Sequence, residues 1–86
     1  MHEMSIAAAV MEGVEAESAR FGGARVAKVG LRVGELSGVE VESLRFCLEI
    51  VAQEIEFDIQ TSPGTELNFA YMEIEDESAA GTESTE

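Results

Sequence analysis

The chain has 86 residues and a formal net charge of −13, from 18 acidic and 5 basic residues. This length suits a single domain. The charge argues against nucleic acid and anionic membranes as partners, because binding to a phosphate backbone needs a basic face. It favours cationic partners, including metal ions, although solubility alone also accounts for it. The sequence has no signal peptide and no long apolar run, so we expect a cytoplasmic protein.

The first predicted element is a helix over residues 4–20, where apolar residues recur with helical spacing. Gly13 weakens this helix by about 1 kcal/mol. Phe-Gly-Gly at 21–23 ends it, because glycine adopts the left-handed conformation common after a helix. The apolar stripe comprises Ile6, Ala7, Val10, Met11 and Val14.

A strand is predicted over residues 25–34, where apolar residues alternate with others. Gly30 and Gly34 lie on the second face with Lys28 and Arg32, and two glycines there predict the close approach of another backbone. The apolar face comprises Ala27, Val29, Leu31 and Val33.

A second helix is predicted over residues 40–53, after a Gly-Glu-Leu-Ser-Gly turn at 34–38. Ser37 with Glu40 fits a capping box. Phe46 and Ile50 lie off the apolar stripe, which predicts that this helix is covered on more than one side. The stripe comprises Val41, Leu44, Leu48 and Val51. Cys47 lies beside it and is expected to act as a small buried apolar residue. It is the only cysteine of the chain, which excludes an intramolecular disulfide.

Residues 54–60 alternate cleanly and predict a second strand, followed by turn residues at 61–64. Residues 65–75 predict a third strand, whose apolar positions change phase at Tyr71 and indicate a bulge nearby. Residues 76–86 are acidic and rich in Ser and Thr, which is typical of a disordered tail.

The predicted order is therefore helix, strand, helix, strand, strand. We expect a two-layer α+β domain over residues 1–75, with two helices on a three-stranded sheet. The first two strands and the helix between them form a right-handed crossover unit. The last two strands are expected to pair as a hairpin.

The amino terminus offers a compact set of nitrogen donors. The amine of Met1, the main-chain nitrogen of His2 and its imidazole can close adjacent chelate rings on one metal ion. Only ions such as Cu(II) and Ni(II) commonly displace the main-chain proton, in square-planar geometry. Glu3 adds an oxygen ligand or orients the imidazole. The alternative is an ordinary frayed terminus, since His2 is the only histidine.

No catalytic constellation is present in the sequence. There is no second histidine to orient a nucleophile and no glycine-rich phosphate loop with a lysine. One His and one Cys cannot build an ordinary four-ligand zinc site. We therefore expect a protein that is not an enzyme.

Three segments together resemble the HypA/HybF family of nickel metallochaperones. These are MHEMSIAAAVMEGVE, RVAKVGLRVGELSGVEVESLRF and TELNFAYMEIEDE, and the similarity covers roughly residues 1–52 and 64–77. The resemblance implies nickel delivery for [NiFe]-hydrogenase maturation, and in some organisms for urease. It also implies a nickel-handling maturation GTPase and the hydrogenase large subunit as partners.

The resemblance implies that Met1, His2 and Glu3 bind Ni(II). Family members carry an acidic residue after the Gly-Glu-Leu-Ser turn that is linked to the nickel site. Glu40 and Glu42 are the candidates here for a second-shell or auxiliary role, and the alignment of the turn does not choose between them.

The chain departs from the family at its zinc ribbon. Family members carry two CxxC pairs between the second and last strands, whereas this chain has only a short connection there and a single cysteine. It resembles a nickel domain without its zinc domain, so no zinc is expected. The thin core and exposed sheet edges favour a homo-oligomer or strand exchange.

Two other interpretations stay open at this point. The chain could act as a metal-independent protein–protein interaction module of the maturation machinery, with an incidental terminus. The acidic segment from Glu73 to Glu86 could hold metal loosely, although its composition is typical of a solvating tail.

Overall fold

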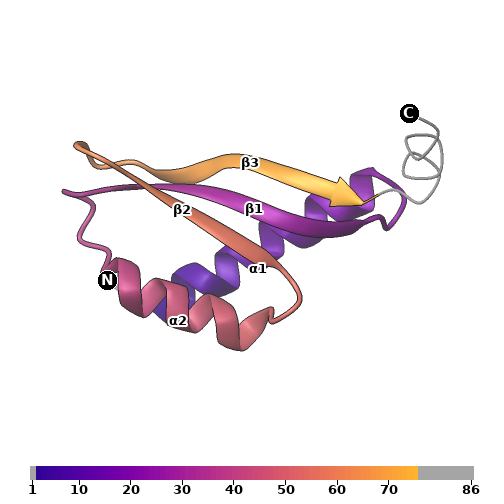
Figure 1. The fold of residues 1–86 in the computed structure, drawn as a ribbon, viewed down its shortest axis with the longest axis horizontal. Helices are drawn as coiled ribbons and strands as arrows, with labels where there is room; N and C mark the ends of the chain where they lie inside the picture. The colour runs from indigo at the N-terminus through magenta and orange to yellow at the C-terminus, as the bar shows by residue number, and fades with distance from the viewer. Residues whose placement is uncertain (1, 76–86) are drawn as a thin grey trace.

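The computed structural model describes residues 2–75 of the chain. The order of its elements is the predicted one, and the α+β class is confirmed. β2 and β3 each begin two residues later than predicted. The predicted disordered tail, residues 76–86, lies outside the described residues. The elements are α1 (Glu3–Arg20), β1 (Arg25–Gly34), α2 (Val41–Val51), β2 (Glu56–Ser62) and β3 (Leu67–Glu75) (Figure 1).

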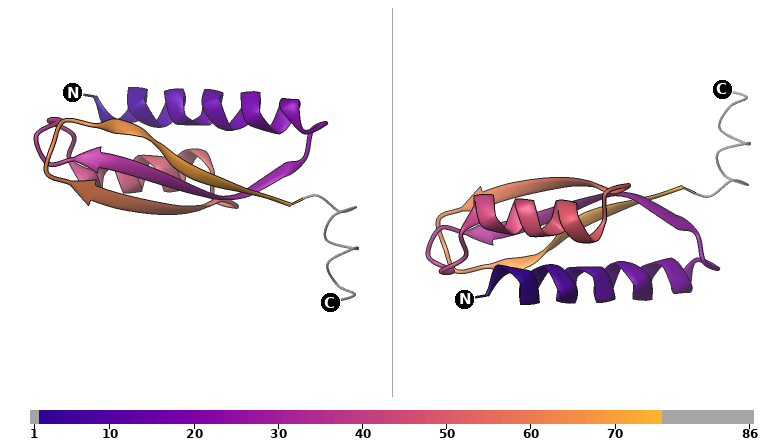
Figure 2. Two further views of the ribbon diagram at one scale, coloured as in Figure 1. Left: turned by 90° about the horizontal axis from the view of Figure 1, so that it is seen from above. Right: turned by 90° about the horizontal axis from the view of Figure 1, so that it is seen from below.

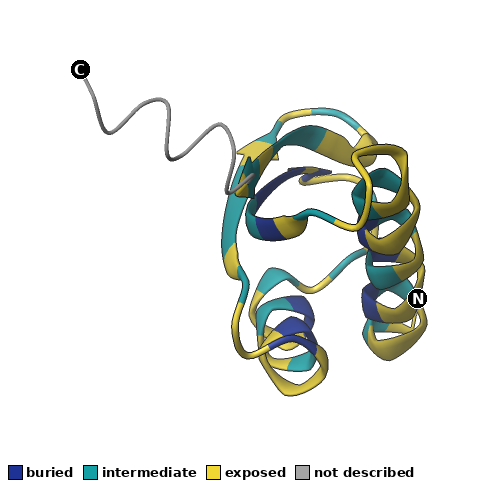
Figure 3. Ribbon diagram, turned by 90° about the vertical axis from the view of Figure 1, so that its right-hand side faces the viewer, coloured by how far each residue is buried: buried dark blue, intermediate teal, exposed yellow. Residues whose placement is uncertain are grey.

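The three strands form one sheet in the order β2-β1-β3. The central strand, β1, pairs parallel with β2 and antiparallel with β3. Both helices lie on the same face of the sheet, which gives the two predicted layers (Figures 1 and 3). The predicted hairpin is wrong, because β2 and β3 each pair with β1 and are not neighbours. Within residues 2–75, neither helix is long and apolar enough to span a bilayer.

The connection between β2 and β3 crosses the carboxyl end of β1, which explains why the hairpin does not form. The N–H of Gly34 donates to the carbonyl of Glu66 at 2.6 Å, and the N–H of Leu36 donates to the carbonyl of Gly64 at 2.9 Å. A Cβ at Gly34 would overlap the Gly64 carbonyl. The predicted close approach of another backbone is therefore confirmed at Gly34.

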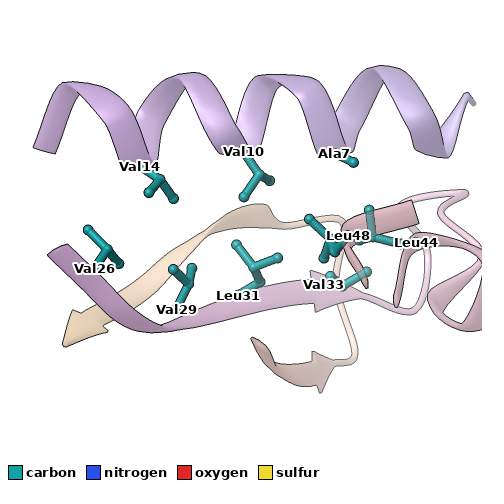
Figure 4. Packing of buried hydrophobic residues seen from close by; sticks show 9 residues of the cluster. All are labelled: Ala7, Val10, Val14, Val26, Val29, Leu31, Val33, Leu44 and Leu48. Atoms are coloured by element: carbon teal, nitrogen blue, oxygen red, sulfur yellow. The ribbon is translucent and has the colours of Figure 1, made fainter. Parts of the chain in front are cut away.

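The core lies between the sheet and the two helices, and β1 supplies its central row (Figure 4). Leu44 and Leu48 of α2 are completely buried, which stabilises the fold by about 1.5–3 kcal/mol each. The predicted stripe on α1 is confirmed for its three buried members. The buried cluster comprises Ala7, Val10, Val14, Val26, Val29, Leu31, Val33, Leu44 and Leu48.

A shift in the pairing of β1 with β3 changes the predicted inward row of β1. The register shifts between Val26 and Lys28, so that Ala27 has no partner in the ladder. Val26 is buried and takes the inward place that the strict alternation predicted for Ala27, which is only half-buried. The prediction failed because a bulge reverses the alternation of side chains beyond it.

The predicted bulge near Tyr71 is confirmed. Tyr71 pairs with Gly30 and Phe69 pairs with Leu31, so Ala70 is the extra residue of β3. Phe69 faces α1, where a Cβ at Gly13 would lie 2.7 Å from its ring. Gly13 therefore weakens the helix but makes room for an aromatic side chain of the sheet.

The start of α2 differs from the predicted capping box. Glu40 is the N-cap residue, and its carboxylate accepts a hydrogen bond from the N–H of Glu42 at 3.4 Å. Ser37 lies too early in the chain to cap, and its hydroxyl accepts from the N–H of Val39 at 3.2 Å. Gly38, with a φ of 83°, turns the chain between the two.

The side of α2 that faces away from the core is open. Phe46 is 63% exposed and Ile50 is 52% exposed. The sequence predicted that this helix is covered on more than one side, and no other part of residues 2–75 provides that second cover.

Candidate metal centre

Three segments come together at one end of the domain. They are the start of α1, the turn at residues 34–40 that leads into α2, and the connection at residues 63–66 (Figure 2). The start of α1 therefore lies next to two loops that are distant from it in the sequence. The candidate residues of the terminus and of the Gly-Glu-Leu-Ser-Gly turn can act together only because of this arrangement.

Glu3 makes the contact that joins the terminus to α2. Its Oε2 accepts a hydrogen bond from the main-chain N–H of Glu40 at 3.0 Å, across 37 residues of sequence. Glu40 immediately precedes α2, so Glu3 also places a negative charge at the positive end of that helix dipole. Glu3 thus connects the starts of both helices.

This contact changes the acidity of Glu3. The pKa of its carboxyl lies below the ordinary value of 4.5, chiefly because the N–H of Glu40 donates to the charged carboxylate. The N–H of Glu3 itself acts in the same direction, and so do the positive charges of the amino terminus and His2. Glu3 is therefore ionised at neutral pH and supplies a negative charge beside His2.

His2 is the N-cap residue of α1 and has an extended backbone, with φ −90° and ψ 107°. Its carbonyl accepts from the N–H of Ile6 at 3.2 Å, whereas its exposed side chain makes no capping hydrogen bond. The N–H of an N-cap residue takes no part in the hydrogen bonding of the helix. A metal ion can therefore replace this proton without breaking a helical hydrogen bond.

The two acidic candidates at α2 occupy different places. The main chain of Glu40 contacts Glu3, while the Glu40 carboxylate is turned toward the N–H of Glu42. No three His, Cys, Asp or Glu side chains of residues 2–75 converge as a side-chain metal site requires. A nickel site at this end would thus depend on main-chain donors, and Met1 lies outside the described residues.

The sequence did not predict a polar network on the open face of the sheet. The Tyr71 hydroxyl donates to Asp58 Oδ2 at 2.6 Å, and its ring lies over Gly30 of the strand between them. Gln60 Nε2 donates to the same oxygen at 3.3 Å, and Lys28 pairs with Glu56 at 3.6 Å. The network joins β2 to β3, and within residues 2–75 none of its hydrogen bonds or ion pairs reaches His2 or Glu3, so we assign it a structural role.

The fold and this end of the molecule define a small α+β domain that presents its amino terminus beside the turn into its second helix. A family model described as "Hydrogenase/urease nickel incorporation, metallochaperone, hypA" matches residues 1–81. The chain therefore belongs to the HypA family of nickel-incorporation metallochaperones.

Curated relatives agree with this assignment. The chain is 44% identical over 70 residues to the hydrogenase maturation factor HypA of Azoarcus sp. strain BH72, covering 76% of this chain and 61% of the relative. It is 40% identical over 75 residues to that of Methanopyrus kandleri, covering 87% of this chain and 46% of the relative. It is 44% identical over 54 residues to the hydrogenase maturation factor HypA of Pelodictyon phaeoclathratiforme, covering 63% of this chain and 46% of the relative. The chain spans about half of the length of the curated relatives it matches.

Proposed function

We propose that this chain binds Ni(II) at its amino terminus and delivers it for the maturation of [NiFe]-hydrogenase, and in some organisms of urease. The donors are the amine of Met1, the main-chain nitrogen of His2 and the His2 imidazole. Together they close adjacent chelate rings on a square-planar ion. Membership of a nickel-incorporation family supports the choice of metal.

The hydrogen bond between Glu3 and the main chain of Glu40 is the observation that most favours this proposal. It anchors the residue next to His2 to a second segment, which limits the motion of the terminus around the metal. One carboxylate oxygen is thereby engaged, so we assign Glu3 mainly a positioning role, with its second oxygen as an auxiliary ligand. The main-chain N–H of Glu40 holds the Glu3 carboxylate in place, and the main-chain N–H of Glu42 holds the Glu40 carboxylate.

An exposed site with few ligands suits delivery. His2 is exposed at one end of the described domain, so incoming ligands of a partner can displace the donors one at a time. The net charge of −13 raises the local concentration of cations. The proposed recipients are the nickel-handling maturation GTPase and the hydrogenase large subunit.

A nickel titration of the untagged chain beside its His2→Ala variant tests the proposal. Calorimetry with visible absorption at about pH 7.5 should give one site with a yellow, planar-type band, and the variant should lose both. Cys47→Ala is the control and should bind normally. Unchanged affinity and stoichiometry in His2→Ala would remove His2 from the site.

A second candidate function is a metal-independent interaction module, which the open side of α2 favours. The two functions respond differently to an extension of the amino terminus by a few residues. The extension should abolish nickel binding if the metal proposal holds, and it should leave the binding of a protein partner intact.

A further inference from the structure

α2 has a second apolar strip on the side opposite the core. Phe46 and Ile50 are four residues apart, which places them one turn apart on the same side of the helix. They are 63% and 52% exposed, although the next-door Leu48 is completely buried. Figure 3 shows exposed residues along the side of α2 that points away from the sheet.

Carboxylates border this strip. Glu42 and Glu49 are exposed and lie one turn from Phe46 on the same side of the helix. Arg45, the single basic residue of α2, is half-buried, and its charge acts on Asp58 of β2. We call the surface formed by Glu42, Phe46, Glu49 and Ile50 the outer face of α2. It combines an apolar centre with an acidic margin.

We propose that the outer face of α2 binds an amphipathic helix of a partner protein, whose apolar side is bordered by Lys or Arg. Side chains four residues apart form the ridge that packs into the groove of another helix. Lys or Arg on the partner would complement Glu42 and Glu49. A second copy of this chain is disfavoured, because each copy has a net charge of −13 and would bring carboxylates against carboxylates.

This inference goes beyond nickel binding and does not depend on it. Its apolar and charged groups lie on α2, whereas the proposed donors lie at the amino terminus. α2 nevertheless begins beside Glu3. The amino-terminal end of the outer face therefore lies near Glu3 in the fold.

The test uses the full chain, labelled for NMR, and two synthetic helical peptides. One peptide has a leucine face bordered by lysines, and the other has the same leucine face bordered by glutamates. The lysine peptide should bind with 1:1 stoichiometry and shift the amide signals of α2, with affinity that falls as salt is added. The glutamate peptide should bind at least about tenfold more weakly.

Matched variants locate the binding face. The Phe46→Ser/Ile50→Ser variant should weaken binding of the lysine peptide by about tenfold or more, because it removes the apolar centre. Phe21→Ser is the control, since Phe21 is 54% exposed but lies at the end of α1. Glu42→Gln/Glu49→Gln should weaken binding and its salt dependence, whereas Glu12→Gln/Glu15→Gln on α1 should do neither. His2→Ala should bind the peptide normally.

Several outcomes would overturn the proposal. Binding of neither peptide, or equal binding of both, would reject the basic amphipathic helix as the occupant. Equal losses in the α1 and α2 variants would indicate non-specific attraction to an acidic protein. Self-association that the Phe46→Ser/Ile50→Ser variant abolishes would identify a second copy as the occupant instead.

Discussion

Among residues 2–75, Glu3 is the side chain whose hydrogen bond links the start of α1 to the start of α2. Replacing it with alanine removes both the hydrogen bond to Glu40 and the charge beside His2. Glu3→Gln removes only the charge, because the amide oxygen still accepts from the N–H of Glu40. Nickel affinity should fall about ten- to a hundredfold in Glu3→Ala and by less than about tenfold in Glu3→Gln.

NMR separates the positioning role from a direct one in the same pair of variants. The amide signal of Glu40 should move in Glu3→Ala and stay close to its place in Glu3→Gln. If the two variants lose nickel affinity equally, the charge of Glu3 or a direct bond to nickel matters and the anchoring does not.

For individual residues, the sequence predicts the members of the candidate site more successfully than it predicts the contacts that those members make. The donors at Met1 and His2 follow from the chemistry of a terminal histidine, and they stay a prediction. The link from Glu3 to Glu40 spans 37 residues and depends on how the two helices sit on the sheet, so no local pattern contains it. Ser37 looked like a cap because it is spaced correctly from Glu40, but Gly38 turns the chain between them.

Gly34 is required where the connection from β2 to β3 crosses the end of β1. A Cβ there would collide with main-chain atoms of Gly64 and Glu66, which cannot rotate out of the way. Gly34→Ala should therefore lower the free energy of unfolding by about 2–3 kcal/mol, as measured by urea titration.

Gly13→Ala is the matched control for that substitution. Its Cβ would meet the tip of the Phe69 side chain, which is 40% exposed and can move. The gain in helix propensity, about 1 kcal/mol, should offset much of the cost. If Gly34→Ala were as stable as the unsubstituted chain, residues 63–66 would not cross β1 as described.

The hydrogen bond from Tyr71 to Asp58 should make the stability of the sheet depend on pH. It lowers the pKa of Asp58 below 3.8 and raises the pKa of Tyr71 above 10.0. The Asp58 contribution is present above 3.8 and is lost as pH falls through the lowered folded value. The Tyr71 contribution is present below 10.0 and is lost as pH rises through the raised folded value.

Tyr71→Phe should therefore have a lower urea midpoint than the unsubstituted chain at neutral pH. The difference should shrink toward strong acid and toward strong alkali, and a series from about pH 3 to about pH 11 would show it. A difference that stays constant with pH would mean that the hydroxyl is not bonded to a charged Asp58.

The elements themselves were predictable because apolar periodicity is a local property of the sequence. The bulge at Ala70 was predictable for the same reason, since the apolar positions of β3 change phase there. The hairpin was wrong because β1 lies between β2 and β3 and pairs with both, and the order of strands in a sheet is not a local property of the sequence. The short connection at residues 63–66 suggested a hairpin, but these residues pass over Gly34 instead.

Across the domain as a whole, the functional candidates gather at one end and on the helix that starts there. The amino terminus, the turn into α2 and the connection from β2 to β3 meet at one end of the domain (Figure 2). The outer face of α2 extends from this end. The open face of the sheet, with its network around Tyr71, provides stability elsewhere.

The most direct test of the central claim is a nickel titration of the chain with a free and with a blocked amino terminus. The two proteins differ by an acetyl group on the amine of Met1, which removes the terminal amine from the chelate and changes no side chain. We expect one-to-one binding with a planar-type band in the free chain and loss of that band in the acetylated one. The same band and the same affinity in both proteins would contradict the account, because nickel would then bind without the terminal amine.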